Sequence, residues 1–198
     1  GNVSVDNTVI KATHSLTPIT ALGGAEPRVD TIASVTCCEV PEVALTSVTA
    51  RLGRESQTKT ALKKAVGAAA PEVGKAVTKT LTAFWIGPDQ WMVEAPFESH
   101  EDLAAQLKAL TQDNASVVEQ TDAWTRFDVS GESVLSVMEL LCNLNSRAMD
   151  VNTASRSSIH HLGCFVRRIA DDKFGIYGPR ASAGSLHHAI IAAMSSIR

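Results

Sequence analysis

Apolar and polar residues repeat one pattern twice along the chain. Residues 83–96 read AFWIGPDQWMVEAP, in which two apolar runs flank a turn signal at 87–90. Residues 164–179 read CFVRRIADDKFGIYGP, with the same arrangement around 170–172. Short runs rich in β-branched and aromatic residues, separated by turn-forming residues, are typical of β-hairpins. The pattern therefore predicts two similar hairpins.

The segments before the first hairpin predict a strand and a helix. Residues 43–53 are rich in Val, Leu and Thr, which favours a strand. Thr58 is a suitable N-cap for a short helix with Leu62 and Val66 on one face, and Gly67 is a suitable stop.

After the first hairpin, residues 99–102 resemble a capping box that opens a second helix. Its residues Leu103, Leu107 and Leu110 share one face. Residues 115–120 then predict a strand that leads into the second half.

The second half repeats this order. Its predicted elements are a strand at 125–131, a helix at 131–142, an irregular segment at 143–156, hairpin strands at 157–169 and 173–179, and a last helix from about Ser182.

The order β-α-β-β-α is thus stated twice, in halves of about 43–112 and 115–198. Two such halves pack most simply as antiparallel sheets with helices on their outer faces, which predicts an α+β fold with an approximate two-fold. Residues 1–40 show weak periodicity, and we expect them to be an irregular N-terminal arm in which 29–37 alternates well enough for an edge strand. We expect residues 41–198 to form a single domain.

Composition narrows the class of protein. The chain has 198 residues, of which 44% are hydrophobic and 20% charged, as in globular proteins. It has no apolar run of about 18 residues and no basic leader segment, so we expect no membrane partner and a cytoplasmic location. The net charge is −3 and no basic stripe is interleaved with aromatics, which argues against nucleic-acid binding.

Charge is distributed unevenly. Residues 51–79 hold seven basic and two acidic side chains, whereas residues 80–122 hold one basic and eight acidic side chains. This asymmetry has two interpretations: a polar docking surface for a partner, or two solvated faces.

Candidate metal ligands and reactive thiols were sought among histidines and cysteines. In a single strand, His160 and Cys164 would share a face but lie about 13 Å apart, and His161 would face the other way, which argues against a metal site. Adjacent Cys37 and Cys38 would face opposite sides of a strand and have no basic neighbour in sequence, so we interpret them as structural thiols. No glycine-rich phosphate loop or GxSxG motif occurs, and we predict no catalytic residues.

Aromatic and basic residues at the hairpins have two interpretations. Trp85 and Trp91 flank the first turn, and Arg167 and Arg168 lie in the second hairpin. They either pack in the core or form a partner interface, because interface centres are enriched in tryptophan and arginine.

Five stretches together resemble the gamma subunit of heterotetrameric sarcosine oxidase. They are EVPEVALTSVTARLGRE, AFWIGPDQWMVEAP, EQTDAWTRFDVSG, SIHHLGCFVRRIADDKFGIYGPR and ASAGSLHHAI. The resemblance runs from about residue 40 to residue 198 and rests on the order and spacing of the five. One departure is Ala181-Ser182-Ala183, where the family often has Ser-Phe-Ala.

The resemblance implies a non-catalytic assembly subunit that packs chiefly against alpha, with beta and delta as further partners. The family's holoenzyme oxidises sarcosine to glycine with O2 and passes the one-carbon unit to tetrahydrofolate. Its FAD, FMN and NAD are held by alpha and beta and its zinc by delta, so the resemblance implies no cofactor in this chain. The gamma subunit in turn resembles the folate-binding fold of the glycine-cleavage T-protein.

A second functional class stays open. The chain is alternatively a free-standing folate-binding protein or an aminomethyltransferase of the T-protein type. In such folds a carboxylate commonly pairs with the pterin ring, and the candidates here are Glu119, Asp122 and Asp128. Carboxylates at strand ends are otherwise turn or cap residues.

Overall fold

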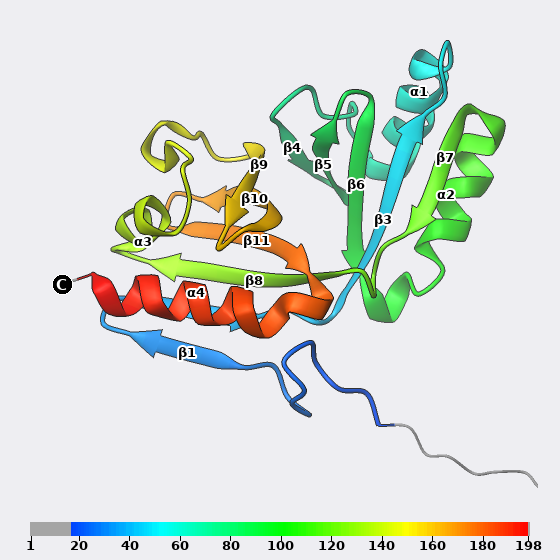
Figure 1. Cartoon of the computed structure of the whole chain (residues 1–198). Coiled ribbons are helices and arrows are strands. Elements are labelled where there is room, and N and C mark those ends of the chain that lie inside the picture. Colours follow the sequence, from blue (N-terminus) through cyan, green and yellow to red (C-terminus); the bar gives the residue numbers. More distant parts are fainter. Residues whose placement is uncertain (1–16, 198) are drawn as a thin grey trace, which may run out of the picture.

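Two antiparallel sheets lie side by side in the computed structural model, which describes residues 17–197 (Figure 1). Each sheet carries two helices on its outer face, so the predicted α+β class is confirmed. Within these residues, no helix is both long enough and apolar enough to cross a membrane.

The first half builds a five-stranded sheet in the order β4-β5-β6-β3-β7. Its elements are β3 (Val43–Ala50), α1 (Glu55–Val66), β4 (Ala76–Thr78), β5 (Thr82–Gly87), β6 (Gln90–Pro96), α2 (Leu103–Thr111) and β7 (Ala115–Glu119).

The second half builds a six-stranded sheet in the order β1-β2-β8-β11-β10-β9. Its elements are β8 (Trp124–Gly131), α3 (Val134–Leu141), β9 (Ala154–Ile159), β10 (Leu162–Ala170), β11 (Lys173–Pro179) and α4 (Ala183–Ser196), joined by β1 (Val29–Ile32) and β2 (Val35–Glu39).

The two sheets are equivalent strand by strand, but their fifth strands come from different places in the chain. The strand β7 follows α2 and pairs with β3, whereas its counterpart beside β8 is β2, which precedes the whole first half. The two halves do repeat one order of elements, but that order is β-α-β-β-β-α: each half has one strand more than predicted, β4 in the first and β9 in the second. Of the predicted arm, residues 1–16 lie outside the described residues, and the single edge strand expected at 29–37 is a hairpin of the second sheet, formed by β1 and β2. The strand at 115–119 belongs to the first sheet rather than leading into the second.

Three local predictions for the helices are wrong in detail. The helix α1 starts at Glu55, so Thr58 is not its cap; the Thr58 hydroxyl donates to the carbonyl oxygens of Arg54 at 2.9 Å and Asn114 at 3.0 Å. Asp102 is the N-cap residue of α2 and makes no side-chain cap, so residues 99–102 form no capping box. Leu110 is 43% exposed and lies outside the buried face of α2.

The segment 157–169 is two strands rather than one. His160 and His161 form the tight turn between β9 and β10, with φ of +49° and +66°. Positive φ at both central residues is the geometry that two-residue hairpins require. Two successive histidines carry no recognised signal for such a turn, which explains why the strand was predicted to continue.

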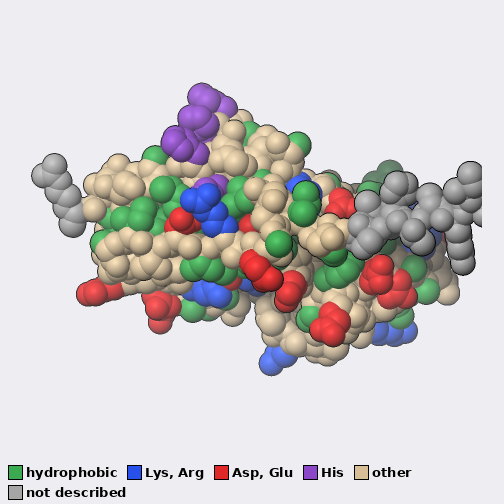
Figure 2. All heavy atoms as spheres, turned by 90° about the horizontal axis from the view of Figure 1, so that it is seen from below, with side chains coloured by type: hydrophobic (Ala, Val, Ile, Leu, Met, Phe, Trp, Pro, Cys, Tyr) green, Lys and Arg blue, Asp and Glu red, His purple; other side chains and the backbone are tan. Residues whose placement is uncertain are grey.

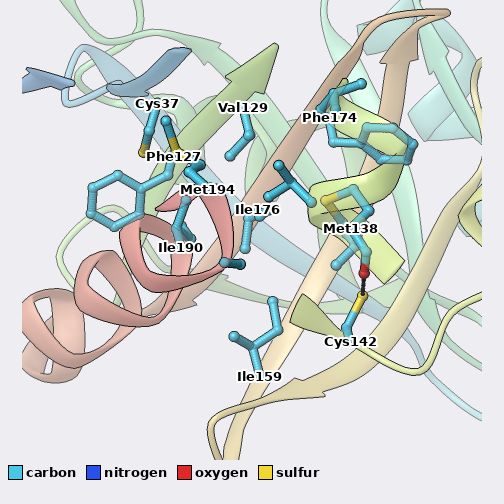
Figure 3. Packing of buried hydrophobic residues seen from close by; sticks show 14 of the residues in the cluster. Cys37, Phe127, Val129, Met138, Cys142, Ile159, Phe174, Ile176, Ile190 and Met194 are labelled. Carbon is cyan, nitrogen blue, oxygen red and sulfur yellow. Dashed lines mark hydrogen bonds between the residues drawn. The ribbon is translucent and has the colours of Figure 1, made fainter. Parts of the chain in front are cut away.

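The outer face of each sheet packs against its helices to form a separate core. In the first half, Trp91 and Val93 of β6 pack with Leu62 of α1 and with Leu103 and Leu107 of α2. Figure 3 shows the second core, in which sheet residues meet α3 and α4; its labelled members include Phe127, Val129, Phe174, Ile176, Met138, Ile190 and Met194. Each fully buried side chain of this size contributes about 1.5–3 kcal/mol.

Candidate functional site at the junction of the halves

The inner faces of the two sheets meet in a third, mixed cluster. Side chains alternate along β6, so Trp91 and Val93 face the helices while Met92 and Glu94 face the other sheet. There Phe84 packs against Tyr177, with ring centroids 4.9 Å apart, and against Phe165 at 6.2 Å. Aromatic contacts therefore join β5 to β10 and β11.

Six polar residues lie beside these aromatics and form the junction cluster: Glu94, Arg126, Asp128, Arg167, Lys173 and Tyr177. Glu94 connects the halves, because its Oε1 accepts from Arg126 Nη1 at 2.8 Å and its Oε2 from the Tyr177 hydroxyl at 2.6 Å. The Glu94 carboxylate comes from the first sheet, whereas both donors come from the second.

Asp128 completes the charge balance around Arg126. Arg126 donates from Nε to one Asp128 oxygen at 2.7 Å and from Nη2 to the other at 2.9 Å, a paired geometry that fixes the guanidinium plane. Lys173 Nζ lies 2.8 Å from the same carboxylate. Glu94 and Asp128 thus share the Arg126 guanidinium, and Asp128 also pairs with Lys173.

Arg167 closes the network on its other side. Its Nη1 donates to the Tyr177 hydroxyl at 2.9 Å and lies 3.6 Å from Glu94 Oε1. Its guanidinium carbon lies 5.2 Å from the centroid of the Phe84 ring, within cation–π range. The buried Arg167 Nε has no hydrogen-bond partner within residues 17–197.

Two groups of the junction cluster, Tyr177 and Arg126, have shifted pKa values. Burial raises the pKa of Tyr177 well above its usual value, so the phenol stays protonated. Burial alone lowers the pKa of Arg126, but neighbouring groups including Glu94 and Asp128 outweigh it and hold that pKa above its ordinary value. The Arg126 guanidinium therefore stays charged, and its ion pairs with Glu94 and Asp128 join the two halves.

A pocket of about 500 Å³, called here the junction pocket, opens beside this cluster. Its walls are residues 18–21 and 25–27, residues 40–43 leading into β3, and residues 121, 122 and 124–126 at the start of β8, together with Phe97 and Arg180. Glu39 holds the first wall in place, accepting from the backbone N–H of Leu22 at 3.0 Å and of Arg28 at 3.2 Å. Arg180 Nη2 donates to the carbonyl of Ile19 at 3.2 Å.

The four residues predicted for a partner interface lie in different surroundings. Trp91 is 2% exposed and donates from Nε1 to the Pro71 carbonyl at 2.8 Å, and Arg167 is 4% exposed within the junction cluster. Both of these side chains are therefore buried within this chain. Trp85 and Arg168 are half-buried, and for these two an interface role stays a prediction.

The three carboxylates considered as partners of a pterin ring lie in different surroundings. Asp128 is buried and held by Arg126 and Lys173. Glu119 is exposed and accepts from the backbone N–H of Thr121 at 2.8 Å. Asp122 alone lines the junction pocket.

The predicted thiol and histidine candidates do not converge. Cys37 and Cys164 are buried in the second core, and the turn carries His160 and His161. Nowhere in 17–197 do three His, Cys, Asp or Glu side chains gather closely enough to hold a metal ion.

The burial of each cysteine predicts how fast its thiol reacts with a disulfide reagent. It raises the pKa of Cys37 to about 12 and that of Cys164 to about 11, and Cys142 is also buried. We expect one fast-reacting thiol, Cys38, when the folded chain meets a chromogenic disulfide reagent at pH 8, and four after unfolding, because only exposed thiolate reacts. A Cys38→Ser chain that still reacted quickly would contradict this.

These pKa values also predict alkaline destabilisation. The folded-state pKa of Cys37 and of Cys164 lies above the unfolded value of about 8.5, so folding favours the neutral thiols. Their full contribution is present below about pH 8.5 and is lost as pH rises through the folded-state values. Urea titrations from pH 8 to 11 should show a falling free energy of unfolding, and Cys37→Ala should show a shallower fall.

Sequence reasoning missed Glu94, Tyr177 and Lys173 as members of a site. The available signal was a glutamate inside the apolar run WMVEA of a predicted central strand. Buried charges of this kind are normally paired. The partner could not be named, since Tyr177 lies 83 positions away.

Comparison with known proteins shows that the fold of this chain is a known one. No protein-family model and no curated protein matches the sequence. A chain of the heterotetrameric sarcosine oxidase from Corynebacterium sp. U-96, solved with pyrrole 2-carboxylate, matches with a TM-score of 0.74 at 22% identity, over 86% of this chain and 90% of that chain.

A second solved structure is more distant. The glycine cleavage system aminomethyltransferase T from Bartonella henselae matches with a TM-score of 0.60 at 13% identity, over 81% of this chain. The match covers 46% of that longer chain. The chain described here has the fold that these two proteins share.

Proposed function

We propose that this chain is the non-catalytic gamma subunit of a heterotetrameric sarcosine oxidase, where it serves in assembly in the cytoplasm. The observation that carries the proposal is the extent of the fold match, which covers 90% of a chain of such an oxidase as well as 86% of this one. A shared small module would leave much of one chain unmatched. The sequence stretches that resemble the family support the same assignment.

The chemistry of the junction cluster supports a structural role. Its two carboxylates, Glu94 and Asp128, are both engaged in internal ion pairs, and its tyrosine is held protonated. A buried, paired network of this kind fixes the relative position of two elements. We propose that it makes this chain a rigid block against which the alpha subunit packs.

The described residues lack the usual glycine-rich loop for a dinucleotide. The connections from β3 to α1 and from β8 to α3 contain no GxGxxG sequence to receive a pyrophosphate. We therefore propose that FAD, FMN and NAD belong to the alpha and beta subunits and zinc to delta.

The folate-binding alternative has one observation in its favour, which is Asp122 at the wall of the junction pocket. Buried Asp128 does not fit a pterin-pairing role, because Arg126 and Lys173 already occupy its oxygens. Asp122 is exposed, so it lacks the enclosure that would make a carboxylate selective for a pterin ring.

Co-expression tests the main proposal. We expect an affinity-tagged form of this chain to co-purify with the alpha, beta and delta subunits of the source organism, with flavin absorbance in the complex. The isolated chain should be colourless and inert towards sarcosine. An isolated chain that carried flavin or oxidised sarcosine would contradict the proposal.

Calorimetry separates the two functional classes. We expect no heat of binding when tetrahydrofolate is titrated into the isolated chain. Micromolar binding that Asp122→Asn abolishes would favour the folate-binding alternative.

A further inference from the structure

The junction pocket has an apolar lining that residues 17–197 leave uncovered. Ile19 is 62% exposed and Phe97 is 40% exposed, and both line the same pocket. Trp124 adds a half-buried indole, whose ring stacks on Phe165 at 4.9 Å and whose Nε1 donates to Gln120. Single exposed apolar residues are common, but convergence around one hollow is a mark of an interaction site.

Unpaired acidic residues surround this lining. Glu26, Glu42 and Asp122 line the pocket, and all three are exposed. None of the three forms an ion pair with a group of residues 17–197. They are called the acidic rim here. Figure 2 shows acidic side chains gathered in the middle of the face seen from below.

The two arginines of the pocket do not cancel the acidic rim. Arg126 is already balanced by Glu94 and Asp128 inside the junction cluster. Arg180 is directed to the Ile19 carbonyl, so it balances at most one of three carboxylates. The mouth of the pocket therefore carries net negative charge, and an apolar centre inside a charged border is the usual anatomy of a protein interface.

We propose that the junction pocket and its acidic rim are the docking site for a partner subunit, whose docking segment places an apolar side chain next to lysine or arginine. This rests on the assembly function proposed above and deepens it. Charge complementarity identifies the basic residues of the segment. A partner protein fits better than a small ligand, because Ile19 projects too far into solvent to be covered by a molecule held inside the pocket.

Charge reversal of the acidic rim tests the proposal. The test variant is Glu26→Lys, Glu42→Lys and Asp122→Lys in one chain. The matched control is Glu72→Lys, Glu132→Lys and Asp172→Lys in one chain. These three acids lie elsewhere in the described chain, are exposed and form no ion pairs within it, so the control changes the net charge by the same amount. Each tagged chain is co-expressed with the alpha, beta and delta subunits, and retained flavoprotein is measured by its absorbance.

We expect the test variant to retain at least about tenfold less flavoprotein than the wild type, and the control to retain the wild-type amount. Phe97→Ala should weaken retention without any change in charge. Circular dichroism and thermal melting verify folding. Should the triple variant not fold, Glu26→Gln, Glu42→Gln and Asp122→Asn in one chain replaces it, with retention expected to fall by a smaller factor.

The outcomes separate the two proposals. Retention that is unchanged in the rim variants overturns the docking site while the assembly function stands. A wild-type chain that retains no flavoprotein overturns the assembly function itself. If the rim variants instead convert a dimer of the isolated chain into monomers, then the occupant is a second copy of this chain and the docking proposal is wrong.

Discussion

Replacing Arg126 by methionine should lower the free energy of unfolding by about 3 kcal/mol, because it removes the cation that two buried carboxylates share and leaves Glu94 only the longer contact with Arg167. The Arg126 side chain is 12% exposed, and it is the direct partner of both Glu94 and Asp128. Methionine retains most of the apolar stem of arginine, so the loss of stability comes from the missing charge rather than from missing volume. Urea denaturation followed by tryptophan fluorescence measures it.

An exposed arginine provides the control. Arg147 pairs with Glu139 and its side chain is 57% exposed, so Arg147→Met should lower the free energy of unfolding far less than Arg126→Met does. Adding Glu94→Gln to Arg126→Met should recover about 1 kcal/mol, since one buried charge is removed while Asp128 keeps Lys173. Equal losses for Arg126→Met and Arg147→Met would show that the junction cluster does not hold the halves together.

Gly131→Ala should cost about 3 kcal/mol or more, through backbone strain and a direct clash. Gly131 has a φ of +137°, and a Cβ there would lie 1.9 Å from the carbonyl oxygen of Ser34. It pairs with Val35 where β2 joins β8. The substitution therefore forces the β1–β2 hairpin away from the second sheet.

Hydrogen exchange locates this effect. Amides of β1 and β2 should lose protection more than those of the first sheet, alongside the fall in stability measured with urea. Gly163→Ala is the matched control, because that glycine has open space around its Cβ position and no positive φ; it should change stability by less than about 1 kcal/mol. Similar losses at both glycines would contradict the role given to the close approach at Ser34.

The parts of the fold that could be predicted are those fixed by local sequence. The turn after Gly87 and the turn at 171–172 join the strands as their turn-forming residues indicate. Gly67 ends α1 with a φ of +81°, as a left-handed stop requires. Helix faces follow from the spacing of apolar residues, so Leu103 and Leu107 are buried as expected.

Apart from the helix caps and the turn at 160–161, the parts that failed depend on distant partners. An alternating segment such as 29–39 predicts a strand, but nothing within it says that β2 pairs with β8. The junction cluster is also non-local, because Glu94 and Tyr177 meet only when the two sheets pack. Trp91 and Arg167 illustrate the same limit: tryptophan and arginine serve both cores and interfaces, and only packing places these two inside.

The strand β2 belongs to the second sheet but precedes the first half in the chain, and this affects how the protein folds during synthesis. Cys37 of β2 pairs with Val129 of β8, and the whole first half is synthesised between these two residues. The second sheet is therefore completed by one of the earliest segments made. Until then the edge of β8 stays open to pairing with other chains. A fragment cut between the halves would separate β2 from its neighbour. Although the halves resemble two domains, we expect them to fold as one unit.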